Sequence, residues 1–131
     1  MHHIFIIRHG TTTAVESRII QGITDSPLST KGRREAEKTA RALSGIHFKH
    51  IYSSPIGRAR ETAEILARPH EIDPVYLESL REMNFGGLEG KKYYHPQRET
   101  NTPYHMMLLA LRRVYAPVSY THLTLPTNRE V

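Results

Sequence analysis

The sequence predicts a single α/β domain with three layers, in which helices cover both faces of a mostly parallel sheet. A continuous apolar run at residues 4–7 is typical of a buried strand. Two amphipathic segments, at residues 30–43 and 55–67, are typical of helices. Strand, helix, strand and helix alternate along the chain, which favours a parallel sheet. The length of 131 residues fits one domain.

The first strand is expected at residues 4–7, which are apolar without alternation. That pattern predicts a strand buried on both faces. Arg8, His9 and Gly10 follow it directly. In open α/β sheets the reactive crevice lies beyond the carboxyl ends of the strands. We therefore expect Arg8 and His9 in a functional site, with Gly10 allowing a ligand to approach the backbone closely.

The next elements are a loop and an amphipathic helix. Residues 21–28 are expected to form a loop because they contain Gly, Asp, Ser and Pro. Ser29 is a suitable N-cap for a helix over residues 30–43. The apolar face of this helix contains Ala36, Ala40 and Leu43.

A second strand is expected at residues 47–52 and a short third strand at residues 75–77. Between them, Ser54 and Pro55 predict the N-cap and first residue of a helix that ends near Ala67. The inward side chains of this helix are expected to be Ala59, Thr62, Ala63 and Leu66.

The first turns of this helix carry Arg58 and Arg60. The amino end of a helix is already positive, so cations there are disfavoured. Free N–H groups and arginines together bind anions, of which phosphate is the most common. The pattern therefore predicts an anion site, with two solvated surface arginines as the alternative.

A further candidate is Glu82, which lies in a glycine-rich loop at residues 80–90. Beside Arg8, His9 and Arg58, its carboxylate would be suited to general acid or base catalysis. The alternative is an ordinary surface glutamate.

Composition narrows the class of protein. The formal charge of +5 favours anionic partners, such as small phosphorylated metabolites. The basic residues are scattered, so nucleic-acid binding is not expected. The absence of cysteine excludes disulfides, thiolate zinc sites and a cysteine nucleophile. The sequence predicts no metal or other cofactor, no membrane association and a cytoplasmic location.

Four motifs occur in order between residues 4 and 90. They are Ile6-Ile7-Arg8-His9-Gly10-Thr11, Gln21-Gly22-x-x-Asp25-Ser26-Pro27-Leu28, Tyr52-Ser53-Ser54-Pro55-x-Gly57-Arg58 and Leu80-Arg81-Glu82-x-x-Phe85-Gly86-x-Leu88-Glu89-Gly90. Together they resemble the histidine phosphatase superfamily, which includes the cofactor-dependent phosphoglycerate mutases.

This resemblance implies a phosphoglycerate mutase-like fold and a phosphohistidine intermediate. It implies that His9 is the nucleophile and that Arg8 and Arg58 hold the phosphoryl oxygens. Glu82 would donate the proton to the leaving group. The further residues implied at the substrate are Gly10, Thr11, Thr12, Gln21 and Gly22.

The loop at residues 82–90 is similar to that of the phosphatase branch of the superfamily. The phosphoglycerate mutases instead carry an arginine and further basic residues directly after the glutamate. Hydrolysis of a small phosphomonoester is therefore favoured. Phosphoglycerate mutase-type phosphoryl transfer and a non-catalytic phospho-ligand binding module are the alternatives, and a basic nucleic-acid binder ranks last. The sequence specifies neither the phosphomonoester nor the oligomeric state.

The chain departs from the family pattern in two ways. Thr11 and Val15 stand where the family often has a glutamate and a phosphate-contacting asparagine. We expect that contact to be lost, or supplied by the hydroxyl of Thr11 or Thr12. No apolar run ending in His-Gly follows Glu82 to supply the family's second pocket histidine. The remaining candidates, expected to be solvated, are His95, His105 and His122.

These departures predict an incomplete histidine phosphatase domain over residues 1–116, with an apolar helix at residues 104–115. Residues 117–131 resemble translated adapter sequence and are expected to be non-native. The chain is therefore expected to be the amino-terminal part of an enzyme, with activity and stability impaired by truncation.

Overall fold

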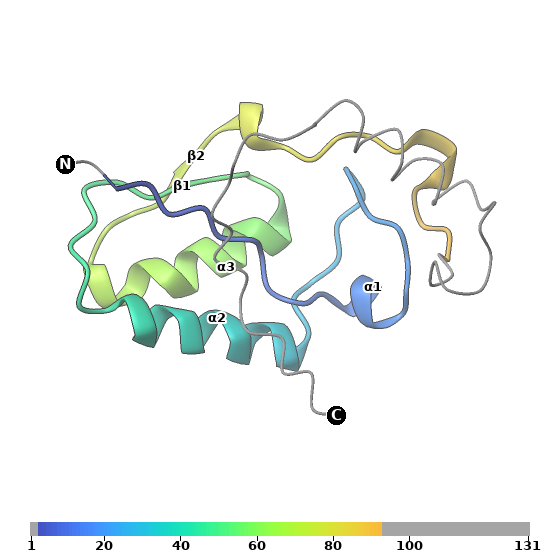
Figure 1. The fold of residues 1–131 in the computed structure, drawn as a ribbon. Helices are drawn as coiled ribbons and strands as arrows, with labels where there is room; N and C mark the ends of the chain where they lie inside the picture. The colour runs from blue at the N-terminus through green and yellow to red at the C-terminus, as the bar shows by residue number, and fades with distance from the viewer. Residues whose placement is uncertain (1–2, 93–131) are drawn as a thin grey trace.

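The computed structural model describes residues 3–92. Its helices are α1 (Thr13–Glu16), α2 (Thr30–Leu43) and α3 (Gly57–Ala67), and its strands are β1 (Tyr52–Ser53) and β2 (Val75–Tyr76). Short 3-10 turns occupy Arg68–His70, Glu78–Leu80 and Gly86–Leu88. The two strands are parallel, with Tyr52 opposite Val75 and Ser53 opposite Tyr76 (Figure 1). The predicted α/β class is confirmed. Of the strand expected at residues 47–52, only Tyr52 is in a strand, and the strand expected at residues 75–77 ends one residue earlier.

Helix α2 has the predicted bounds because its local signals agree. The Ser29 hydroxyl accepts a hydrogen bond from the Gly32 N–H at 3.1 Å, which caps the first turn. Ala36 and Ala40 are buried, whereas Leu43 is half-buried.

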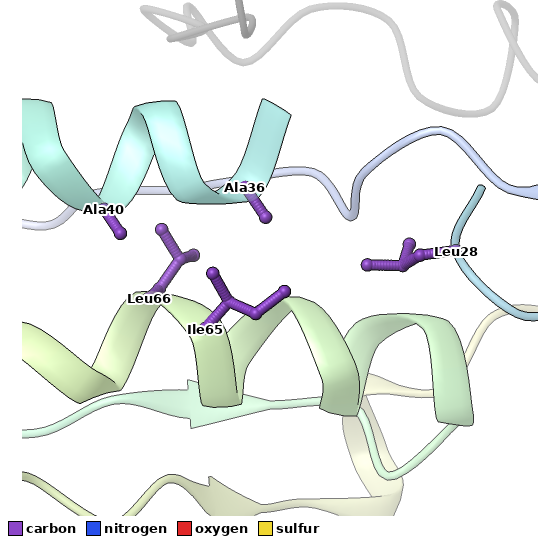
Figure 2. Close-up of a cluster of buried hydrophobic side chains, with 5 residues drawn as sticks. All are labelled: Leu28, Ala36, Ala40, Ile65 and Leu66. Atoms are coloured by element: carbon purple, nitrogen blue, oxygen red, sulfur yellow. The ribbon is translucent and has the colours of Figure 1, made fainter. Parts of the chain in front are cut away.

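The core lies between α2 and α3. Figure 2 shows the cluster, which consists of Leu28, Ala36, Ala40, Ile65 and Leu66. The alanines of α2 let the two helices approach closely. Helix α3 also contacts β1, so it lies between α2 and the strands (Figure 1).

The segment at residues 4–7 differs from the prediction. It has no assigned strand, and Ile4 and Ile6 are 88% and 60% exposed. Phe5 and Ile7 are half-buried: Ile7 packs against the core cluster, and the Phe5 ring meets the Phe48 ring edge-on. The prediction of a strand buried on both faces is wrong for the described residues, because they provide neither a ladder partner nor a cover for the outer face.

The start of α3 also differs. The helix begins at Gly57 with Ile56 as N-cap, so Ser54 is not its cap. Instead the Ser54 hydroxyl accepts a long hydrogen bond from the Ile56 N–H at 3.4 Å. The Arg58 N–H donates to Asp25 Oδ1 at 3.3 Å. A carboxylate from a distant loop therefore replaces the local cap that the sequence predicts.

Several predictions concern residues outside those that the structure describes. These are the helix at residues 104–115, the division at residue 116, the tail at residues 117–131, and His95, His105 and His122. Among residues 3–92, no helix combines the length and apolar character needed to cross a membrane.

The backbone at Gly10 and Thr11 passes unusually close to the first turn of α2. A Cβ atom on Gly10 would lie 2.5 Å from the Gly32 carbonyl oxygen. A Cβ atom on Gly32 would lie 1.9 Å from the Thr11 carbonyl oxygen. Both distances are too short for real atoms, so this contact requires glycine on both sides.

We expect Gly32→Ala to lower the free energy of unfolding. Alanine in a helix normally stabilises by roughly 1 kcal/mol relative to glycine, but overpacking costs about 1–3 kcal/mol. The expected net loss, measured by urea denaturation, is the difference of these two effects, about 1 kcal/mol. Gly45→Ala is the control, because among the described residues nothing lies within 4 Å of its Cβ position. A gain in stability from Gly32→Ala would contradict the close contact.

Candidate active site

The imidazole of His9 is held in one tautomer by two neighbours. Its Nδ1 lies 2.8 Å from the Gly10 carbonyl oxygen, which can only accept a hydrogen bond. Its Nε2 lies 3.3 Å from Arg58 Nε, which can only donate. The proton of the neutral ring is therefore on Nδ1, and the lone pair is on Nε2. An imidazole in this state is a nucleophile at Nε2.

The surroundings of His9 favour the neutral ring. Burial is the largest cause and lowers the pKa of His9. The hydrogen bond to Gly10 opposes this shift, and the positive charges of Arg58 and Arg8 lower the pKa further. The negative charge of Glu82 acts in the opposite direction. The net pKa lies below the usual value of 6.5, so the lone pair on Nε2 is available at neutral pH.

Arg58 lies at the centre of the site and is only 2% exposed. Besides its bond to His9, its guanidinium donates to the carbonyl oxygens of Gly22 and Thr24 at 2.7 and 3.0 Å. It also forms an ion pair with Asp25, with 3.3 Å between Nη1 and Oδ1. A buried charge requires such partners. The side chain is thus fixed beside His9.

The same Asp25 oxygen contacts both the backbone N–H and the guanidinium of Arg58. The amino end of α3 therefore already holds an anion, supplied by the protein. A Cβ atom on Gly57 would lie 2.2 Å from this carboxylate, so glycine is needed where Asp25 approaches. Asp25 was present in the sequence motif but was not predicted to contact Arg58.

Arg60 is not part of the predicted anion site. Its guanidinium lies over the Tyr76 ring, 4.3 Å from the ring centroid. This cation–π contact joins α3 to β2. Arg58 and Arg60 are two positions apart on a helix, so they do not share a face. The prediction that both arginines bind one anion is wrong for Arg60.

The backbone around the site is fixed by polar contacts from both helices. The Gly10 N–H donates to the Thr62 hydroxyl of α3 at 3.1 Å. The N–H and hydroxyl of Thr11 both donate to Glu35 Oε2 of α2, at 3.0 and 2.8 Å. Gly10 and Thr11 are thus positioned directly after the nucleophile candidate.

Thr12 is fully buried, and its hydroxyl caps α1 by accepting from the Val15 N–H at 3.2 Å. Gln21 Nε2 also donates to this hydroxyl at 2.8 Å. Three of the predicted substrate contacts are therefore occupied by hydrogen bonds to other groups of the protein: the hydroxyls of Thr11 and Thr12 and the amide of Gln21. Their contact with substrate stays a prediction, as does that of Gly22.

Glu82 and Arg8 are exposed. Glu82 Oε1 accepts a hydrogen bond from the Met83 N–H at 2.9 Å. Both side chains lie near enough for their charges to act on the pKa of His9. Of the four predicted catalytic residues, His9 and Arg58 are in direct contact. The catalytic roles of His9, Glu82, Arg8 and Arg58 stay predictions.

The described part of the protein contains no set of side chains arranged to bind a metal ion. Across residues 3–92, the structure brings together no group of three His, Asp or Glu side chains that could hold an ion.

A family model described as the histidine phosphatase superfamily (branch 1) matches residues 4–118. The chain belongs to this superfamily. It is also 42% identical over 89 residues to a probable phosphoglycerate mutase, GpmB, of Escherichia coli. That match covers 68% of this chain and 41% of the relative, so the chain spans well under half the length of the curated relatives it matches.

Solved structures of the superfamily agree with the fold. A phosphoglycerate mutase from Bacillus anthracis is 40% identical with a TM-score of 0.63, over 66% of this chain and 40% of the other. A mycobacterial glucosyl-3-phosphoglycerate phosphatase is 28% identical with a TM-score of 0.68, and the match covers 79% of this chain and 49% of the other. The expected resemblance and the phosphoglycerate mutase-like fold are confirmed. The neighbours include both mutases and phosphatases.

Glu89 is a member of the fourth superfamily motif, and the sequence assigned it no role. Its carboxylate accepts hydrogen bonds from the N–H groups of Gly22, Ile23, Thr24 and Phe85. Partial burial alone would raise the pKa of Glu89, but hydrogen bonding from the Thr24 side chain and from these backbone N–H groups outweighs burial and lowers the pKa to about 2. Glu89 is therefore ionised throughout the neutral range. Its donors could not be found from the sequence, because backbone N–H groups have no residue pattern.

We expect the His9 imidazole to titrate below pH 6.5 when followed by NMR. Arg58→Gln should raise the midpoint, because a nearby positive charge is removed, but not fully to 6.5, because burial is the larger cause. Acidification below pH 6.5 should also lower the free energy of unfolding, since the unfolded chain binds the His9 proton more tightly. Arg34→Gln, on the exposed side of α2, should leave the midpoint unchanged. A wild-type midpoint at or above 6.5 would be inconsistent with the buried, neutral ring.

Proposed function

We propose that the protein containing this chain hydrolyses small phosphorylated metabolites through a phosphohistidine on His9. The observation that supports this most is the state of the His9 ring. Its Nδ1–H is bonded to the Gly10 carbonyl, its lone pair is on Nε2, and Arg58 lies 3.3 Å from that atom. A nucleophile and a cationic group for the phosphoryl oxygens thus stand side by side.

In the first step, His9 Nε2 attacks the phosphorus atom and the ester P–O bond breaks. In the free protein the Arg58 Nε–H group donates to His9. When substrate is bound, it donates to a phosphoryl oxygen instead. Arg8 neutralises further charge from the exposed side. Phosphoryl transfer depends mainly on such positioning and charge stabilisation. The leaving alkoxide takes a proton from the Glu82 carboxyl group and departs as the alcohol.

In the second step, water attacks the phosphohistidine and the P–N bond breaks. Glu82, now a carboxylate, accepts a proton from the attacking water. Inorganic phosphate leaves, and His9 returns to its neutral form with the lone pair on Nε2. A covalent intermediate divides one difficult displacement at phosphorus into two easier ones.

Two observations favour hydrolysis. The loop after Glu82 continues with Met83, Asn84 and Phe85, so no basic side chain follows the proton donor to hold a second acidic group. One structural neighbour is a glucosyl-3-phosphoglycerate phosphatase.

The second candidate is mutase-type phosphoryl transfer, in which the phosphohistidine passes its group to another hydroxyl. It is favoured by the name of the 42% identical relative, a probable phosphoglycerate mutase. The first step and the roles of His9 and Glu82 are the same. The two functions differ only in whether water or substrate accepts the phosphoryl group.

We expect brief exposure to a labelled activated aryl phosphate to give an acid-labile, base-stable phosphoprotein. His9→Ala should abolish the label, whereas Glu82→Gln should leave it detectable, because an activated leaving group does not need a proton donor. Label that persists in His9→Ala would exclude His9 as the nucleophile. Replacement of the exposed His3 by alanine is the control and should change nothing.

Hydrolase and mutase are separated by the fate of 3-phosphoglycerate. Hydrolysis should release inorganic phosphate at the rate at which substrate disappears. Mutase chemistry would yield 2-phosphoglycerate with little free phosphate, and only after priming with a bisphosphorylated glycerate. Isomerisation without phosphate release would reject the hydrolase proposal.

A further inference from the structure

One carboxylate connects two loops of the site. Glu89 Oε1 accepts from the N–H groups of Ile23 and Phe85 at 3.1 and 3.0 Å. Glu89 Oε2 accepts from the N–H groups of Gly22 and Thr24, both at 3.1 Å. Three of these donors belong to the loop after Gln21, and the fourth belongs to the loop that carries Glu82. Each oxygen of the carboxylate thus accepts two backbone hydrogen bonds.

The segment at residues 22–24 is bound on its other side by Arg58. The carbonyl oxygens of Gly22 and Thr24 accept from the Arg58 guanidinium at 2.7 and 3.0 Å. Gly22 and Thr24 therefore each bind the carboxylate through the N–H group and the guanidinium through the carbonyl group. In the peptide unit that joins Gly22 to Ile23, the C=O faces Arg58 and the N–H faces Glu89, so its dipole has the favourable direction for both charges.

We propose that Glu89 is a positioning residue, which holds Arg58 against His9 through the backbone of residues 22–24. Glu89 does not touch the reacting atoms. It fixes the two carbonyl groups, these fix the guanidinium, and the guanidinium places its Nε–H beside His9 Nε2. Through Phe85 it also ties the loop of the proton donor Glu82 to the loop that binds Arg58.

Close packing at Gly22 supports this role. A Cβ atom there would lie 2.2 Å from the Met83 carbonyl oxygen and 2.4 Å from Glu89 Oε1. The two loops are therefore in direct contact at the carboxylate, with no room for a side chain. Glycine at this position lets Glu89 reach all four N–H groups.

Glutamine cannot replace Glu89, although it has nearly the same shape. The carboxylate has two acceptor oxygens, whereas the amide has one oxygen and an NH₂ group that only donates. In Glu89→Gln, two backbone N–H groups would face that NH₂ group without an acceptor. The 22–24 segment should then move, and Arg58 with it.

Glu89→Gln, in the full 131-residue chain, provides the test, with Glu78→Gln as the matched control. Glu78 is a well-exposed carboxylate that pairs with Arg81 on the surface. We expect hydrogen exchange at Arg58 Nε–H, followed by NMR, to become at least 10-fold faster in Glu89→Gln. Binding of inorganic phosphate should weaken about 10-fold. Glu78→Gln should change neither quantity.

The outcomes distinguish the positioning role from a general loss of stability. Faster exchange at Arg58 Nε–H, with helix amides of α2 as protected as in the wild type, supports the proposal. Unchanged exchange and phosphate binding in a folded Glu89→Gln protein would overturn it. So would equal acceleration at Arg58 and at α2, which would show a purely structural role.

A measurement on the wild-type protein covers the case in which Glu89→Gln does not fold. The amides of Ile23 and Thr24 belong to exposed residues but donate to Glu89. We expect their exchange to be slowed together with that of Gly22 and Phe85. Exchange as fast as that of an unstructured amide would reject the proposal.

This inference rests on the proposed function only in one respect, namely that Arg58 is held in place in order to bind the phosphoryl group. If phosphate does not bind and no phosphohistidine forms in the wild type, the proposed function fails. The exchange of Arg58 Nε–H still reports whether Glu89 positions the guanidinium, so the two failures are distinguishable.

Discussion

The buried guanidinium of Arg58 is the constraint on which the rest of this structure depends. A charge that is 2% exposed would be strongly destabilising without partners. Those partners come from two separate segments: His9 after the first segment, and the loop that carries Gly22, Thr24 and Asp25. Folding must bring both segments to the start of α3 at once. The geometry of the site is therefore a condition of stability as well as of chemistry.

The same constraint explains the state of the nucleophile candidate. A cation beside a half-buried imidazole opposes protonation, and Arg58 adds to burial in lowering the pKa of His9. The hydrogen bond to the Gly10 carbonyl then decides which nitrogen has the lone pair. The arginine for which we propose phosphate binding thus also favours the unprotonated state of His9 Nε2.

Local signals in the sequence were sufficient to predict α2, and the family motifs were sufficient to predict that His9 and Arg58 lie together. Ser29 caps that helix as its position predicts, and the motifs place His9 and Arg58 together. Two features were beyond such signals. An apolar run shows that residues 4–7 favour burial, but not whether a second layer covers Ile4 and Ile6. The capping of α3 by Asp25 spans 33 positions, so no local rule finds it.

Within residues 3–92, the segment at residues 4–7 pairs with no strand, but this does not leave His9 without support. Beyond that segment the backbone is bound by groups of both helices and of the following loop. Gly10 donates to Thr62 of α3, and Thr11 donates to Glu35 of α2. The Thr11 carbonyl accepts from the Ser29 N–H at 2.9 Å, at the start of α2. Since these bonds hold the residues directly after His9, the nucleophile candidate is positioned by the helices, and a strand ladder is not required to fix it.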